Sequence, residues 1–113
     1  MPQANAIIVR VRSDDAQEFE RLFAAEELPI WNDMHAAGRL LSASMTRVGY
    51  GSEEEEGVQD YLIVAEFPGM AEHTAHDNDP RFTSFLAKAR RFQPRSPWVW
   101  GGEILFRPDD EPG

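Results

Sequence analysis

The sequence of 113 residues lacks cysteine, long apolar runs and any excess of basic residues. Without cysteine the chain forms no disulfide bond, no thiolate metal site and no cysteine nucleophile. No apolar stretch approaches the roughly 20 residues that a helix needs to cross a bilayer, so no membrane partner is predicted. Residues 1–5 contain no signal-peptide pattern, which predicts a cytoplasmic protein.

The chain is acidic, because 20 Asp and Glu residues against 11 Lys and Arg residues give a formal net charge of −9. A polyanion such as DNA or RNA is repelled by this charge, and no basic stripe offsets it. Anionic membrane surfaces are disfavoured for the same reason. The sequence also lacks a glycine-rich phosphate-binding loop. Nucleic acids and membranes are therefore not predicted as partners.

Apolar periodicity predicts alternating strands and helices over one domain of residues 1–113, with flexible ends at 1–5 and 108–113. Asp15 with Glu18 fits a capping box at the start of the first helix, Pro29 should kink that helix, and Gly38 should end it. Asp79-Pro80 should divide the second helical region. The predicted strands cover residues 6–12, 40–48, 59–67 and 98–106, and the predicted helices cover about 16–37 and 70–92.

The element order strand, helix, strand, strand, helix, strand is that of the ferredoxin-like α+β fold, βαββαβ. This fold has a four-stranded antiparallel sheet with both helices on one face. The predicted strands are apolar on both faces: Ile7 and Tyr61 lie on one, and Ile8, Leu62 and Val99 on the other. A second copy of the chain is the simplest cover for the helix-free face, which predicts a homodimer.

Two sequence stretches point to a known superfamily. Residues 26–29 (Glu-Glu-Leu-Pro) precede 38–43 (Gly-Arg-Leu-Leu-Ser-Ala), and residues 66–69 (Glu-Phe-Pro-Gly) precede 79–82 (Asp-Pro-Arg-Phe). Over residues 6–107 the chain resembles the dimeric α+β barrel superfamily, which includes antibiotic-biosynthesis monooxygenases and the EthD-like, NIPSNAP-like and YciI-like proteins. The resemblance implies a small cofactor-independent enzyme, of monooxygenase, cyclase or isomerase type, that binds an apolar or aromatic metabolite between helices and sheet.

The resemblance also has departures. Haem-degrading members of the superfamily use an asparagine, a tryptophan and a histidine. Asn5 lies near the asparagine position, but the tryptophan position falls near His76 and the histidine position on Phe85 or Leu86. Haem degradation is therefore disfavoured. A non-catalytic small-molecule-binding or stress-related dimeric module is the alternative function.

Glu26 is the first candidate for chemistry. A period of 3.6 residues per turn places it in the middle of the apolar stripe of Phe19, Leu22 and Phe23. A carboxylate held there would act as a general base, and Tyr61 would donate to a developing oxyanion. His35 is the third predicted catalytic residue. The alternative is that the Pro29 kink turns Glu26 to solvent.

An aromatic-rich set is predicted to line the binding space between helices and sheet. The same side chains suit a core or a dimer interface equally well. An open space with polar groups would favour the enzyme, and a space filled by Phe19, Phe23, Phe82 and Phe85 would favour the binding module. The predicted substrate-binding residues are Phe23, Trp31, Met34, Phe82, Trp98 and Trp100.

The remaining charged candidates are assigned structural roles. The apolar stripe of the second helical region, extended backwards from Phe82, directs His73 and His76 toward solvent. No third ligand accompanies them at metal spacing, so no metal site is predicted. Arg10 and Glu66, near the middle of neighbouring strands, are predicted to form an ion pair across the sheet.

Overall fold

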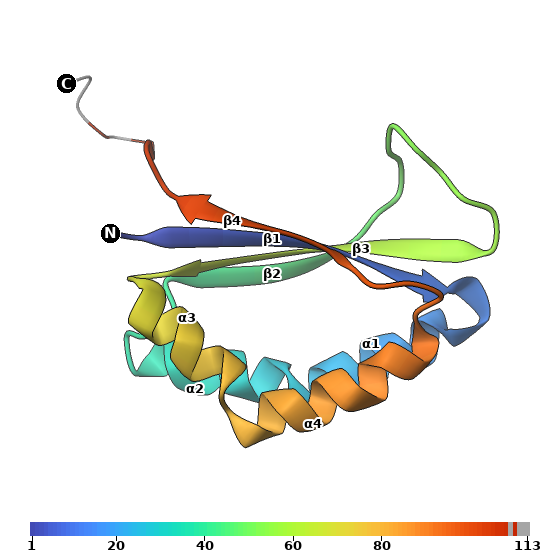
Figure 1. Cartoon of the computed structure of the whole chain (residues 1–113), viewed down its shortest axis with the longest axis horizontal. Coiled ribbons are helices and arrows are strands. Elements are labelled where there is room, and N and C mark those ends of the chain that lie inside the picture. The colour runs from blue at the N-terminus through green and yellow to red at the C-terminus, as the bar shows by residue number, and fades with distance from the viewer. Residues whose placement is uncertain (109, 111–113) are drawn as a thin grey trace.

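The computed structural model, which describes residues 1–108 and 110, has one antiparallel sheet with all its helices on the same side (Figure 1). Two 3₁₀ turns, Ser13–Asp15 and Arg90–Phe92, flank the helices. The elements are β1 (Gln3–Arg12), α1 (Ala16–Glu26), α2 (Leu28–Ala36), β2 (Ser42–Arg47), β3 (Val58–Phe67), α3 (Met70–Asp77), α4 (Pro80–Ala89) and β4 (Trp98–Glu103).

The sheet has the strand order β2-β3-β1-β4, and every neighbouring pair is antiparallel. This is the ferredoxin-like arrangement, so the predicted fold class is confirmed. Val9 lies opposite Tyr61 and Ile7 opposite Ile63. Because side chains on directly paired residues lie on the same face of a sheet, these four side chains face the helices.

Both predicted helix breaks are confirmed. Pro29 stands in the first turn of α2, where its missing N–H leaves no hydrogen bond unmade, and α1 ends three residues earlier. Pro80 opens α4 in the same way, and the Asp79 side chain caps that helix by accepting from the backbone N–H of Arg81 at 2.8 Å. Each of the two predicted helical regions thus consists of two short helices, α1 with α2 and α3 with α4.

Helix ends follow the sequence at one position and depart from it at another. Gly38 has a φ of 73°, the left-handed conformation that glycine adopts without strain after a helix, and it follows α2 as predicted. The capping box of Asp15 and Glu18 is wrong, because Asp15 makes no side-chain capping bond. The 3₁₀ turn of residues 13–15 leads into α1 instead.

The core lies between the sheet and the helices, and aromatic rings fill it beneath α1. Phe23 meets Trp31 and Phe85 edge to face, with ring centroids 5.0 Å and 5.6 Å apart. Phe19 packs against Tyr61 at 4.9 Å. This part of the helix–sheet space is therefore packed.

The helix-free side of the sheet, called the open face below, is apolar. The register places Ile8 between Leu62 of β3 and Trp98 of β4. Trp98 and Trp100 are 49% and 66% exposed there. Val99 pairs with Ile7 and so lies on the helix side, which corrects its predicted face. The apolar strip of the open face comprises Ala6, Ile8, Leu62, Val64, Trp98 and Trp100.

The register also corrects the predicted ion pair. Arg10 lies opposite Asp60, with its Nε 3.6 Å from Oδ1, and its guanidinium lies 4.6 Å from the Trp98 ring centroid. Glu66 lies opposite Ala4, and its carboxylate accepts from the hydroxyl of Ser42 at 2.7 Å. Arg10 and Glu66 are thus too far apart along the strands to pair.

The predicted flexible ends need one correction. Residues 3–5 belong to β1, so the N-terminal end is not free of structure. Of the predicted C-terminal end, residues 109 and 111–113 lie outside the described residues. In the described part of the chain, no helix has the length and apolarity to span a membrane.

Candidate functional site

Two adjacent glutamates at the break between α1 and α2 have opposite environments. Glu26, 26% exposed in its side chain, accepts a hydrogen bond from Lys88 of α4 at 2.8 Å. Glu27 is only 3% exposed and its carboxylate lies 2.7 Å from the Nε2 of His76. The predicted interior position of Glu26 is therefore wrong. Glu27 instead continues the buried stripe of Phe19 and Phe23 at intervals of four residues, since its backbone is still helical and its N–H donates to the Phe23 carbonyl at 3.0 Å.

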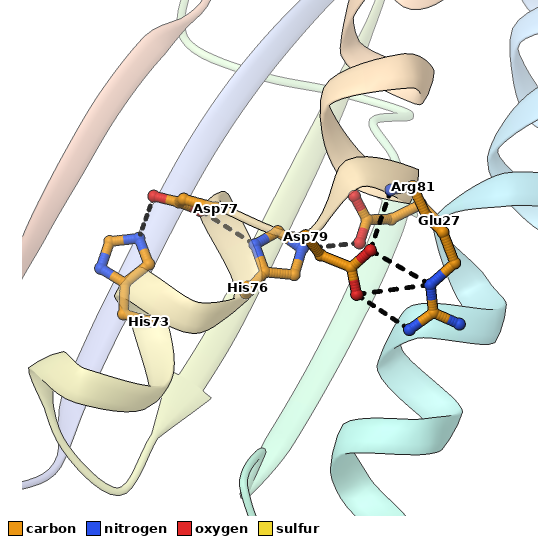
Figure 2. A network of polar contacts seen from close by, with 6 residues as sticks. All are labelled: Glu27, His73, His76, Asp77, Asp79 and Arg81. Carbon is orange, nitrogen blue, oxygen red and sulfur yellow. Dashed lines mark hydrogen bonds and ion pairs between the residues drawn. The ribbon is translucent and has the colours of Figure 1, made fainter.

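His76 of α3 is buried and holds a carboxylate at each ring nitrogen (Figure 2). Its Nε2 donates to Glu27, and its Nδ1 donates to the Oδ1 of Asp77 at 2.9 Å. Burial lowers the pKa of His76, but the hydrogen bonds and charges of Glu27 and Asp77 outweigh burial and raise that pKa above its ordinary value. A carboxylate at each ring nitrogen favours the imidazolium form of His76. The predicted solvent-facing position of His76 is wrong.

His73 extends this network to the surface of α3. Its Nε2 lies 3.1 Å from the second carboxylate oxygen of Asp77. Its ring stacks on Phe67, with centroids 5.1 Å apart and planes 23° from parallel. Asp77 thus joins the two histidines, and Figure 2 shows the run His73–Asp77–His76–Glu27 in one view.

A second network fixes the start of α4 beside the first. The guanidinium of Arg81 donates to Asp79 at 2.9 Å and to Asp33 of α2 at 2.7 Å. The Arg81 hydrogen bonds lower the pKa of the Asp79 carboxyl, so Asp79 stays ionised. These contacts tie α2 to the start of α4, beside the buried Glu27–His76 pair.

Asn5 is the other buried polar side chain on the helix side of the sheet, and it is 8% exposed. It lies in β1 between Ala65 and Gly101. A Cβ added at Gly101 would lie 2.6 Å from the Asn5 Oδ1, so the amide occupies the space that a side chain there would need. Within residues 1–108 and 110, the Asn5 amide forms no hydrogen bond.

Tyr61, predicted as an oxyanion donor, is fully buried and its hydroxyl donates to Glu20 of α1. Arg47 of β2 donates to the same carboxylate through Nε at 2.8 Å. Burial, followed by the bond to Glu20, raises the pKa of Tyr61 to about 12. The hydroxyl is thus already engaged, and by a different carboxylate of α1 from the one that Lys88 contacts.

The other predicted residues separate into three places. His35 is exposed, and its Nδ1 donates to the Leu40 carbonyl at 3.0 Å. Phe23, Trp31 and Met34 are core residues, and Met34 also borders a small hollow with Arg39 and Arg81. Only Phe82 meets the buried network, with its ring centroid 4.4 Å from that of His76.

Trp98 and Trp100 lie on the open face, which corrects their predicted position between helices and sheet. Trp98 pairs with Ile8 and Trp100 with Ala6, and both partners point away from the helices. The Trp98 and Trp100 rings therefore cannot enter the same space as Phe82 in one copy of the chain.

Sequence reasoning missed the members of the network and kept Asn5 only through resemblance. One signal was available: His73 and Asp77 are four residues apart, the spacing at which helical side chains pair. A second signal was the spacing of Glu27, four residues after Phe23 and eight after Phe19 on the buried side of the helix. Across the described residues, no group of three or more histidine and acidic side chains is arranged to hold a metal ion.

The chain has a ferredoxin-like architecture, which it shares with solved structures described as an antibiotic biosynthesis monooxygenase and as a cofactor-independent oxygenase. No family model and no curated protein matches the chain by sequence. The likeness is therefore one of structure.

Three solved structures illustrate the likeness. The Rv0793 protein of Mycobacterium tuberculosis has a TM-score of 0.76 and 14% identity, over 96% of this chain and 100% of that one. SnoaB of Streptomyces nogalater, a cofactor-independent oxygenase crystallised as an asparagine-to-alanine variant, has 0.70 and 13%, over 96% and 98%. An antibiotic biosynthesis monooxygenase has 0.67 and 12%, over 93% and 99%. Such identities establish the fold and not the reaction.

Proposed function

We propose that this chain is a homodimeric, cofactor-independent enzyme of the oxygenase type that binds an apolar or aromatic metabolite on the helix-covered face of its sheet. The similarity to SnoaB extends over nearly the whole of both chains. The fold alone does not carry a reaction, so the proposal rests on the side chains of this face.

The observation that carries the proposal is the amide of Asn5, which forms no hydrogen bond within the described residues although the residue is only 8% exposed. Its amide atoms are not fully buried, so a ligand can reach them from the surface. A bound molecule with a carbonyl or hydroxyl group would complete the bonds of this amide. The absence of a side chain at Gly101 leaves the amide unobstructed.

Burial supports the same location. Beneath α1 the helix-facing side chains are nearly inaccessible, as for Phe19 and Tyr61. Toward β4 the cover is incomplete: Ile7 and Phe82 are half-buried, and Val99 is 63% exposed although it lies on the helix side. A ligand is therefore expected between β1, β4 and α4. It is not expected beneath α1, where aromatic side chains fill the space.

The chemistry constrains the substrate. Without a cofactor, the electrons for oxygen reduction must come from the substrate itself. Conversion of an activated CH₂ group to C=O by O₂ satisfies this balance. One oxygen atom enters the substrate, the other leaves as water with the two hydrogens, and the carbon supplies four electrons. Flat phenolic or ketone-bearing metabolites with such a group are the expected substrates.

The open face is the expected homodimer interface. Its strip of Ile8, Leu62, Val64 and the two tryptophans is continuous across three strands. Exposed apolar patches of this kind mark interaction surfaces. Two copies related by a twofold axis would each cover the strip of the other. A cytoplasmic location remains a prediction.

The proposal is tested by dioxygen consumption and product analysis with a panel of hydroxylated polycyclic aromatics that carry an activated CH₂ group. Binding is followed by quenching of tryptophan fluorescence. Asn5→Ala should weaken binding, whereas Asn32→Ala, at an exposed position of α2, should leave it unchanged. Absence of both binding and turnover across the panel would exclude the proposed function.

One observation favours the non-catalytic binding module as a second candidate. The space beneath α1 is filled by Phe19, Phe23 and Phe85, the arrangement expected of a protein without a deep active site. That candidate predicts saturable binding of an aromatic ligand with no oxygen consumption above the uncatalysed rate.

A further inference from the structure

The two ring nitrogens of His73 have different environments, as they do in a histidine that acts as a base. Its Nε2 lies 3.1 Å from the Oδ2 of Asp77, an ion-pair distance at which a hydrogen on Nε2 is favoured. Its Nδ1 forms no hydrogen bond within the described part of the chain, and the side chain is 26% exposed. In Figure 2 this nitrogen points away from the network.

Two contacts restrict the ring independently. The imidazole stacks on Phe67, and its Nε2 edge faces the Asp77 carboxylate. His76 in turn occupies the other oxygen of Asp77 and is anchored by the buried Glu27. Such support is the arrangement by which a carboxylate orients a histidine and stabilises the imidazolium that forms when the histidine accepts a proton.

The topology brings His73 to the end of the sheet where Asn5 lies. Asn5 pairs with Ala65 in β3, which makes it the diagonal neighbour of Phe67 on the helix side. His73 covers Phe67. His76 is unsuited to the same task because both its ring nitrogens already donate to carboxylates.

We infer that His73 is the proton-accepting catalytic residue of this face, that Asp77 is its positioning residue, and that the ligands are weak O–H or C–H acids. This inference rests on the proposed function for its substrate. In the step, the O–H or C–H bond of the ligand breaks, the proton moves to Nδ1 of His73, and the electron pair stays on the ligand. The resulting imidazolium faces the Asp77 carboxylate, with His76 and Glu27 behind it.

The inference can be tested without turnover, with 4-nitrophenol as the probe, because its neutral and ionised forms absorb at different wavelengths. Bound to the parent protein, the probe should give its proton to His73, and its apparent pKa should fall by about one unit. His73→Gln should bind the probe in its neutral form. Glu72→Gln removes one negative charge from the same helix without altering a contact of His73, and it should behave as the parent does.

Asp77→Asn separates positioning from mere structure. It should lower kcat on any substrate found in the panel while leaving KM within about twofold, since the ring loses the carboxylate beside its Nε2. His73→Gln should lower kcat about a hundredfold or more.

The outcomes are distinct. Equal ionisation of nitrophenol by the parent and His73→Gln, or binding to the parent without ionisation, would overturn the role of His73 and leave the proposed function standing. Failure of nitrophenol to bind the parent would overturn the assignment of weak acids as ligands. Ionisation by the parent without oxygen consumption on the panel would support His73 and exclude the oxygenase.

Discussion

The buried pair of Glu27 and His76 gives the sharpest test of the structure. Glu27→Gln keeps the size of the side chain and an acceptor oxygen but removes the charge opposite an imidazolium. A hydrogen bond to a charged group contributes about 1.5–3 kcal/mol. For a chain of this size, about 1 kcal/mol lowers the Tm by about 4 °C, so the variant should melt about 6–12 °C below the parent.

The neighbouring Glu26→Gln is the matched control. Glu26 pairs with Lys88 where both side chains are partly exposed, and such surface pairs contribute about 0–1 kcal/mol. Two identical substitutions at consecutive positions should therefore differ severalfold in cost. Both are measured by denaturant or thermal unfolding at one protein concentration, because the stability of a dimer depends on concentration.

The pH dependence of the free energy of unfolding tests whether His76 is charged in the folded protein. The pKa of His76 is raised in the folded state, so the stabilisation by its charge is fully present below the unfolded value of about 6.5 and is lost as pH rises through the folded value. The cost of Glu27→Gln should thus be larger at about pH 6 than at about pH 9. An equal cost at both pH values, or equal costs for the two glutamates, would refute a charged buried pair.

Replacing both Glu27 and His76 by leucine tests whether the ion pair is needed for stability or only must not be broken. Glu27→Leu alone should cost about 3–5 kcal/mol, because it strands a buried imidazolium beside Asp77 only. Combined with His76→Leu the cost should largely disappear, since apolar pairs often replace buried ion pairs without loss. A double variant that retained weakened nitrophenol ionisation would agree with an indirect role of His76 through Asp77.

Two further predictions concern the sheet. Gly101→Ala should displace the Asn5 amide, because the added Cβ would lie 2.6 Å from its Oδ1, and should weaken ligand binding. Gly102→Ala should not, because nothing lies within 4 Å of the added Cβ. Equal binding by the two variants would contradict the role of Asn5. Leu62→Asp, at the centre of the open face, should turn a dimer into a monomer in analytical ultracentrifugation, while Ala87→Asp on the exposed side of α4 should not, and a monomeric parent at micromolar concentration would exclude the homodimer.

The fold was predictable because its signals are local. A proline inside a helical pattern interrupts the helix, as Pro29 and Pro80 do here. Gly38 adopts the conformation that ends α2, and alternating apolar residues define the strands. The capping box of Asp15 failed although it is also local, because three residues before the helix preferred a 3₁₀ turn. Strand ends also differed by several residues, as in β4, which stops at Glu103.

The site was only partly predictable. Counting 3.6 residues per turn from Phe23 reaches both Glu26 and Glu27, and the periodicity alone does not decide which of the two is buried. The same count backwards from Phe82 crosses Asp79-Pro80, so it assigned the wrong side to His76. The break at Asp79-Pro80 resets the angle at which the side chains of α3 leave the helix axis, and the contact of His76 with Glu27 fixes that angle.

The sheet face on which Trp98 and Trp100 lie was also not predictable, and it affects how a ligand can bind. A period of two shows that Trp98 and Trp100 share a face, but not which face the helices cover. That choice comes from pairing with Ile8 and Ala6, which a single sequence does not reveal. Because both rings lie on the open face, affinity for an aromatic ligand on the helix side must come from Phe82 and the polar groups of Asn5 and His73. Selectivity should then depend more on an acidic hydrogen and a hydrogen-bonding oxygen than on ring size, so a phenol should bind more tightly than the hydrocarbon of the same shape.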